Sequence, residues 1–235
     1  MFGSRKIDEF VPTGMAGEPG RDIPGEDPLP ESRFIAADAR CPYPERWHSF
    51  DGDSTEVEVA DVAFGLVRAL QPDHVLETGT AFGQVSEAVL HALLGNQHGD
   101  LWTLEVDEER LEYASRRLHV AFLNFAEDYG LEGISDVGVH ALSVSSLDWT
   151  PPDDVRFGFV WLDSLYELRV AEFERFEPYL APGAIVCFHD TAPDRGAHRI
   201  ASGRGLRVEI GNTIGERLHM LDLPTPRGLT IAQKR

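Results

Sequence analysis

The spacing of apolar residues along this chain predicts a series of helices and strands. Regular patterning begins at Asp53–Glu56, which has the spacing of a helix capping box, and apolar residues then recur at helical spacing as far as Leu70. Before that point, prolines and glycines interrupt the chain repeatedly and no period persists. We therefore expect residues 1–50 to form an arm, or a lid over the active site, and residues 51–235 to form the folded domain.

Short apolar runs and amphipathic segments alternate through the rest of the chain. The segments predicted as strands are residues 74–77, 101–106, 137–140, 157–162, 184–188, 206–210 and 229–232. The segments predicted as helices after the first are residues 84–94, 108–125 and 168–180. Strands separated by helices form a parallel sheet that is covered on both faces. The pattern therefore predicts a doubly wound, mostly parallel α/β fold with seven strands.

Composition and charge exclude several kinds of partner. The 235 residues include 40 acidic and 21 basic side chains, a formal net charge of −19, which repels nucleic acids and anionic membranes. No apolar run approaches the roughly 18 residues of a membrane span, and the first ten residues lack the apolar core of a signal peptide. The chain has two cysteines, Cys41 and Cys187, so a disulfide framework is not expected and a cytoplasmic location fits.

A glycine-containing turn follows the first predicted strand. Its pattern, Glu77-x-Gly79-x-x-x-Gly83, lies between a buried strand and a helix. Glycines at such a turn allow tight backbone conformations and close approach of a ligand. The spacing differs from the Gly-x-Gly-x-x-Gly pattern that binds a dinucleotide pyrophosphate, which argues against an NAD(P)-dependent oxidoreductase. A plain strand-to-helix turn would also need glycine, so this motif gains weight only from its neighbours.

Polar side chains follow three other predicted strands. Glu105 ends the second strand, Asp163 follows the fourth, and His189-Asp190 follows the fifth. Because the carboxyl ends of parallel strands meet at one sheet edge, we expect these side chains and the Gly79 turn to surround one cleft. A carboxylate at the tip of the second strand can accept hydrogen bonds from both hydroxyls of a ribose.

These segments together resemble class I S-adenosylmethionine-dependent methyltransferases, in particular the branch that contains catechol-type, natural-product and sugar O-methyltransferases. The resemblance covers roughly residues 53–190 and rests on four segments: Glu77–Gly83, Thr103–Asp107, Phe159–Asp163 and Leu180–Val186 leading into His189-Asp190. It implies the Rossmann-like methyltransferase fold. The segment Leu223–Leu229 suits the closing hairpin of that fold.

The resemblance implies how the cofactor, S-adenosyl-L-methionine, would be held. Gly79, Thr80 and Gly83 would line its methionine part, and Glu105 would hold the ribose. Three further residues complete the implied cofactor set: Glu77, Val106 against the adenine, and Ser143 beyond the third strand.

The metal-dependent branch of these enzymes implies a second site. Its ligands correspond here to Asp163, His189 and Asp190, which would bind Mg²⁺ or Mn²⁺. The histidine departs from the family pattern, since Mg²⁺ prefers oxygen ligands, so the alternative is that no metal binds and His189 acts as general base. Where relatives often have a lysine or histidine base, this chain has Tyr166, whose usual pKa of about 10 makes it a poor base at neutral pH.

The sequence therefore predicts a methyltransferase that acts on a small-molecule acceptor, most simply a hydroxyl on a natural product. Asp163, Tyr166 and His189 are the candidate catalytic residues. Two alternatives stay open: a metal-independent N-methyltransferase with His189 as base, and a non-catalytic protein that keeps the cofactor pocket. Analogy with the family also leaves room for a homodimer.

Overall fold

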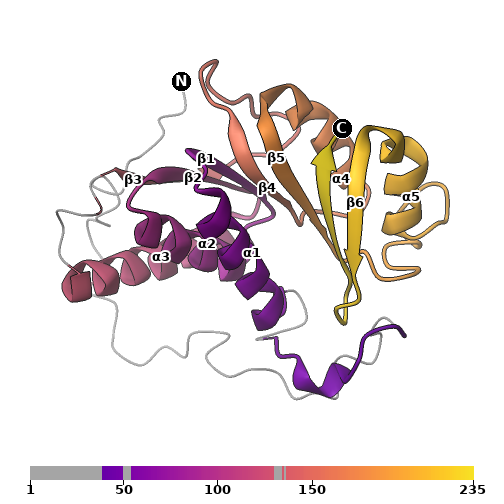
Figure 1. Ribbon diagram of the computed structural model, residues 1–235, viewed down its shortest axis with the longest axis horizontal. Helices are drawn as coiled ribbons and strands as arrows, with labels where there is room; N and C mark the ends of the chain where they lie inside the picture. Colours follow the sequence, from indigo (N-terminus) through magenta and orange to yellow (C-terminus); the bar gives the residue numbers. More distant parts are fainter. Residues whose placement is uncertain (1–38, 50–53, 130–133, 135) are drawn as a thin grey trace.

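The computed structural model describes residues 39–49, 54–129, 134 and 136–235 (Figure 1). Most of the predicted N-terminal arm therefore lies outside the described residues, as does Asp53 of the predicted capping box. Among the described helices, none combines the length and apolar character that crossing a bilayer requires. Both cysteines are buried, and neither forms a disulfide bond.

Seven strands form one sheet in the order β3-β2-β1-β4-β5-β7-β6. The strands are β1 (His74–Thr78), β2 (Gly99–Glu105), β3 (Val137–Ser143), β4 (Phe157–Leu162), β5 (Leu180–His189), β6 (Leu218–Leu223) and β7 (Leu229–Lys234). Neighbours among the first five run parallel, whereas β7 is antiparallel to both β5 and β6. The predicted doubly wound, mostly parallel fold is confirmed, and so is the closing hairpin, whose strands pair Leu223 with Leu229.

In the part of the chain that the structure describes, five α-helices cover the two faces of this sheet (Figure 1). They are α1 (Val57–Leu70), α2 (Gln84–Asn96), α3 (Glu108–Tyr129), α4 (Arg169–Phe176) and α5 (Leu206–Thr213). Successive side chains of a strand point to opposite faces. In β4, Phe159 and Trp161 accordingly pack with α1, α2 and α3, whereas Val160 and Leu162 pack with α4 and α5. The two apolar cores hold the sheet rigid, so its strand ends are fixed relative to one another.

The prediction of a strand at residues 206–210 is wrong, because this segment forms the start of helix α5. The sequence Leu-Arg-Val-Glu-Ile alternates apolar and polar residues, which is the pattern of a strand. Its buried side chains, however, are Leu206, Ile210 and Ile214, at helical spacing, and Val208 between them is about half exposed (48%). The strand that completes the sheet is β6, which the sequence analysis missed.

The capping-box prediction is also wrong for the residues that the structure describes. Helix α1 begins at Val57, Glu56 occupies its N-cap position, and no side chain caps the helix. Thr55 and Glu56 are buried instead, and both side chains reach the carboxyl edge of the sheet. The segment that leads into α1 is thereby part of the site at that edge.

Candidate functional site

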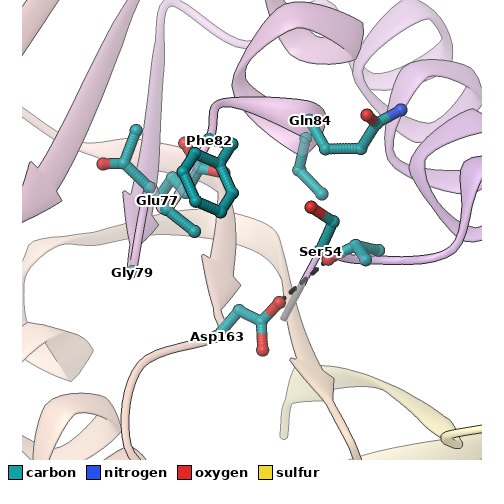
Figure 2. Close-up of a pocket in the computed structure, with 10 residues that line it drawn as sticks. Ser54, Glu77, Gly79, Phe82, Gln84 and Asp163 are labelled. Carbon is teal, nitrogen blue, oxygen red and sulfur yellow. Dashed lines mark hydrogen bonds between the residues drawn. The ribbon is translucent and has the colours of Figure 1, made fainter. Parts of the chain in front are cut away.

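A pocket opens at the carboxyl ends of β1 and β4 (Figure 2). It is lined by Ser54, Thr55, Glu77, Gly79, Thr80, Ala81, Phe82, Gln84, Val85 and Asp163. Of the predicted cofactor residues, Glu77, Gly79 and Thr80 line this pocket. Asp163, which follows the neighbouring strand β4, also lines it. The tips of β1 and β4 thus meet at one cleft as predicted, whereas Glu105, His189 and Asp190 are not among the residues that line it. Of these lining residues, the two charged ones are both acidic, Glu77 and Asp163.

The turn after β1 is fixed by its neighbours on both sides. The Gly79 and Thr80 amides both donate to the Leu104 carbonyl of β2, at 2.9 and 3.3 Å. Gly79 has a φ of +80°, and a Cβ at this position would lie 2.5 Å from the carbonyl oxygen of Asp163. Glycine is therefore required here because the backbone of β4 passes close to the turn, in addition to any need for room around a ligand.

Below the pocket, Glu77 is buried in a hydroxyl network. Its Oε2 accepts hydrogen bonds from Ser86 Oγ and from Thr103 Oγ1, the latter at 2.6 Å, and Thr103 in turn lies 2.5 Å from Thr80 Oγ1. Burial raises the pKa of Glu77 to about 7, because a charged carboxylate is poorly solvated there, although the two hydroxyls oppose the shift. Near neutral pH the carboxyl group is therefore poised between its neutral and charged forms.

Glu105 joins two loops. Its Oε2 accepts from the Ala81 amide at 2.9 Å, and its Oε1 accepts from the amides of Val106 and Asp107 at 2.8 and 3.0 Å. Ala81 has a positive φ of 46°, which is costly for a residue with a side chain. The carboxylate thus holds the turn after β1 against the tip of β2, a structural role that the sequence analysis did not foresee.

Of the remaining predicted cofactor residues, Val106 and Ser143 lie beside this carboxylate, and Gly83 lies at the start of α2. Ser143 is the register partner of Glu105 on β3 and is exposed. Val106 is 69% exposed, so its apolar side chain is free to contact a flat ring. Gly83 has a φ of +78° at the start of α2, and a Cβ there would lie 3.1 Å from the Cβ of Ala114 on α3. Gly83 therefore serves helix packing, and it is not among the residues that line the pocket.

Beside the pocket lies a group of charged side chains that we call the ionic cluster, comprising Glu56, Asp163, Arg169, His189, Asp190 and Arg195. At its centre, His189 is fully buried. Its Nε2 lies 2.7 Å from Glu56 Oε2, and its Nδ1 lies 3.0 Å from Asp163 Oδ2. Ionised carboxylates only accept hydrogen bonds, so both ring nitrogens carry protons and His189 is an imidazolium.

The charges around His189 stabilise this form. Burial by itself would lower the pKa of His189, but the negative charges of Asp163, Asp190 and Glu56 raise it to about 10. An imidazolium whose two N–H groups are both engaged has no free lone pair. This geometry does not support the prediction that His189 is the general base.

Two arginines hold the other carboxylate oxygens of the cluster. Arg169 Nη2 donates to Asp163 Oδ1 at 2.8 Å and lies 3.5 Å from Asp190 Oδ2, while Arg195 Nη2 donates to Asp190 Oδ1 at 2.5 Å. Burial would raise the pKa of Asp190, but the positive charges of His189, Arg169 and Arg195 lower it. Asp190 has a φ of +62°, an unfavourable conformation that these bonds hold in place.

Tyr166 lies at the outer side of the cluster. The Arg169 guanidinium lies 5.1 Å from the centre of its ring, and a Cβ added to Gly196 would lie 2.6 Å from ring atoms. Burial raises the pKa of the Tyr166 hydroxyl above its ordinary value, and the negative charge of Asp190 raises it further. The hydroxyl therefore stays protonated at neutral pH and is no base there.

The predicted metal ligands come together but do not fit a divalent cation. Asp163, His189 and Asp190 each offer a ligand atom, and these atoms lie within 4.8 Å of one another. Metal ligands need free lone pairs, and the His189 nitrogens have none because both face carboxylates. Arginine side chains already supply the positive charge beside the Asp163 and Asp190 carboxylates. These residues therefore do not form a site for a divalent cation.

Four residues of this site escaped the sequence analysis: Thr55, Glu56, Arg169 and Arg195. Thr55 Oγ1 donates to Asp163 Oδ2 at 2.9 Å, the bond drawn as a dashed line in Figure 2. The arginines belong to a helix and a loop that follow the strand tips, where charged residues are common on surfaces. The one signal for Arg169 was its place six residues after Asp163, on the first turn of a short helix.

Comparison with known proteins agrees with this architecture. A family model described as a methyltransferase domain matches residues 76–191, from β1 to just past β5. A search of curated proteins found no match. Among solved structures, the O-methyltransferase TomG of Streptomyces achromogenes, in complex with S-adenosylmethionine, has 22% identity and a TM-score of 0.59, over 77% of this chain and 82% of that one.

Two further solved structures share the fold. An O-methyltransferase from Bacillus cereus, in complex with S-adenosylhomocysteine, has 19% identity and a TM-score of 0.59, over 79% of this chain and 84% of that one. Cofactor-bound Rv0187 from MTB has 18% identity and a TM-score of 0.58, over 97% of this chain and 96% of that one.

The sheet order and the pocket at the ends of β1 and β4 define a methyltransferase fold. Residues 76–191 belong to the methyltransferase-domain family whose model they match. The resemblance to class I S-adenosylmethionine-dependent methyltransferases that the sequence indicated is therefore confirmed, and the chain is a methyltransferase.

Proposed function

We propose that this protein transfers the methyl group of S-adenosylmethionine to a hydroxyl group of a small molecule. The observation that carries the proposal is the charge of the pocket. The two charged residues that line it are Glu77 and Asp163, and none of its lining residues is lysine or arginine. Acidic walls would repel the phosphates of a dinucleotide, whereas they match a ligand with a sulfonium and an ammonium group.

The residues that would hold the cofactor are those at the turn after β1 and the tip of β2. We propose that Glu77 and Thr80, with the backbone around Gly79, bind its methionine part. Glu105 Oε1 already accepts two backbone amides, whereas Oε2 accepts one and retains a lone pair for a ribose hydroxyl. The exposed Val106 would then contact the adenine.

The acceptor is best matched to Asp163. This is the one residue that both lines the pocket and belongs to the ionic cluster. Its carboxylate accepts hydrogen bonds from Thr55, Arg169 and His189, which fix its position, and it can accept another from a hydroxyl. Orientation of the acceptor oxygen towards the pocket is the main service that an in-line displacement requires from the protein.

When bound, S-adenosylmethionine would supply a methyl group attached to a sulfonium sulfur, and this sulfur would leave as a neutral thioether. The protein's own contribution is to orient the acceptor and to receive its proton. With His189 protonated and Tyr166 neutral, neither residue supplies a base at neutral pH. We therefore propose an acidic acceptor hydroxyl, such as that of a phenol, which donates a hydrogen bond to Asp163 and passes its proton to this carboxylate as the new oxygen–carbon bond forms.

Calorimetric titration of the metal-stripped protein with S-adenosylhomocysteine tests the cofactor site. We expect micromolar binding, weakened by roughly tenfold or more in Glu105→Ala, because this change frees the Ala81 turn and removes the ribose acceptor. Glu112→Ala, an exposed residue of α3, is the matched control. No binding of S-adenosylhomocysteine, or binding of NAD instead, would overturn the cofactor assignment.

Methyl transfer itself is tested with 3,4-dihydroxybenzoate as a phenolic probe and with glucosamine as a probe for amines and alcohols. Formation of S-adenosylhomocysteine and of the methylated product is followed by mass spectrometry. Turnover of the phenol and not of the amino sugar supports O-methylation of an acidic hydroxyl. Methylation of the amine contradicts it, and tight cofactor binding without turnover of either probe favours the non-catalytic alternative.

A further inference from the structure

The place between Asp163 and Asp190 is already taken by a side chain. Arg169 is 2% exposed, and its Nη2 lies between the two carboxylates, 2.8 Å from Asp163 Oδ1 and 3.5 Å from Asp190 Oδ2. These are the carboxylates that follow β4 and β5, and together with His189 they form the one group of described residues with metal-ligand spacing. A cation that bridged them would have to displace a buried guanidinium.

Backbone contacts at both strand tips fix this guanidinium. Arg169 Nε donates to the Ser164 carbonyl at 3.1 Å, Nη2 also donates to it at 2.8 Å, and Nη1 donates to the carbonyl of His189. Arg169 is the first residue of α4, so its backbone is fixed by a helix that packs on the sheet. A planar guanidinium with five donors can satisfy such a set of acceptors at once, whereas an ammonium could not.

The charges of the ionic cluster also balance without a metal. Its three carboxylates belong to Glu56, Asp163 and Asp190. Its cations are Arg169, Arg195 and the His189 imidazolium, and the charge of the buried Arg227 also acts on Glu56 and Asp190. The three carboxylates are therefore already offset by positive charge, and a divalent cation would add two positive charges without partners, which is strongly unfavourable in a low-dielectric interior.

From this geometry and this balance of charge we infer that the Arg169 guanidinium replaces a divalent cation between the β4 and β5 carboxylates, so that the protein works without a bound metal ion. Arg169 is in this view a positioning residue: it fixes Asp163 at the pocket and Asp190 beside it. The inference concerns metal binding and does not depend on the proposed acceptor. Its test therefore reads metal binding directly.

The experiment measures Mn²⁺ binding by the loss of the electron paramagnetic resonance signal of the aqueous ion. It compares the wild-type protein with three variants, Arg169→Met, Arg169→Lys and Arg175→Met. Arg175 lies on the same helix and binds the Trp149 carbonyl away from the cluster, so Arg175→Met is the matched control. Thermal melting with and without Mn²⁺ accompanies each titration as a second readout of binding.

We expect the wild type, Arg169→Lys and Arg175→Met to bind no Mn²⁺ and to melt at the same temperature with and without it. Arg169→Met frees Asp163 Oδ1 and Asp190 Oδ2, so we expect it to bind Mn²⁺ at least roughly tenfold more tightly than the wild type and to melt higher with the metal. An Arg169→Met protein that folds only with Mn²⁺ present would also support the inference.

Three results would overturn it. The first is micromolar binding of Mn²⁺ by the wild type, and the second is a loss of cofactor binding or turnover in EDTA that Mn²⁺ restores. The third is an Arg169→Met protein with a native circular dichroism spectrum that binds no Mn²⁺. If Arg169→Met folds under neither condition, the wild-type titration decides, since absence of binding there supports the inference and binding refutes it.

Discussion

The buried carboxyl group of Glu77 predicts a specific dependence of stability on pH. Burial raises its pKa from an ordinary value of 4.5 to about 7 in the folded protein. Between these values the folded state holds a proton that the unfolded state has lost, so the free energy of unfolding falls as the pH rises through this window. Each pKa unit corresponds to about 1.4 kcal/mol, so above about pH 7 the raised pKa of Glu77 lowers the free energy of unfolding by roughly 3 kcal/mol.

Glu77→Gln isolates this effect. Glutamine has the same shape, its carbonyl can accept the hydrogen bonds from Ser86 and Thr103, and it carries no charge. The difference in unfolding free energy between wild type and variant should therefore change by about 2.5 kcal/mol between about pH 5 and about pH 8, with the wild type relatively weaker at the higher pH. Urea denaturation at the two pH values measures this difference, and the pH dependence of all other groups cancels in the comparison.

Glu112→Gln, on the exposed side of α3, is the control and measures what the removal of one surface charge does to the same difference. A change of less than about 0.5 kcal/mol for Glu77→Gln would show that Glu77 ionises as freely as a solvated carboxyl. Burial would then not raise the pKa of Glu77, and this carboxyl group would be fully charged at neutral pH.

Other substitutions test the packing around the site. Gly79→Ala should lower the free energy of unfolding, measured by urea denaturation, by about 3 kcal/mol, because its Cβ would clash with the Asp163 backbone. Gly203 also has a positive φ but has open space around it, so Gly203→Ala should lower the free energy of unfolding by only about 1 kcal/mol. Equal decreases for the two variants would contradict the clash at Gly79. Gly65→Ala, in the middle of α1 with nothing within 4 Å, should raise the melting temperature through about 0.5–1 kcal/mol of helix propensity, and a lower temperature would refute this. Tyr166→Phe should keep the same pH profile of methyl transfer, and loss of a basic limb would identify the tyrosine as a base.

The parts of this molecule that the sequence predicted are those that repeat a local pattern. The strand β4 was predicted with its observed bounds, and Gly79, Glu105 and Asp163 were placed at one sheet edge because each follows a buried strand. The rule that parallel strands present their carboxyl ends together was enough to assemble these residues. No side-chain contact had to be known.

The parts that the sequence could not predict depend on partners far away along the chain. Thr55 and Glu56 lie in the segment whose residue types match a capping box. In the structure their side chains instead contact Asp163 and His189, which lie more than a hundred residues later in the chain. The role of His189 was likewise decided by its neighbours, since a histidine beside one carboxylate can be a base but one between two carboxylates is an imidazolium. Arg169 had only its place six residues after Asp163 to mark it, because the sequence does not distinguish a surface arginine from a buried one.

The bond between Glu56 and His189 has a consequence for how the protein folds. It joins residues 133 positions apart, so it can form only after the intervening strands and helices have been brought together, at a large cost in loop entropy. Contacts of such long range are expected to form late, after the folding transition state. Glu56→Gln should therefore accelerate unfolding while leaving the folding rate nearly unchanged, and a slower folding rate would place this contact in the folding nucleus. If the cluster forms after the transition state, it slows unfolding and has little effect on the folding rate. The lifetime of the folded state then depends on the residues beside the pocket.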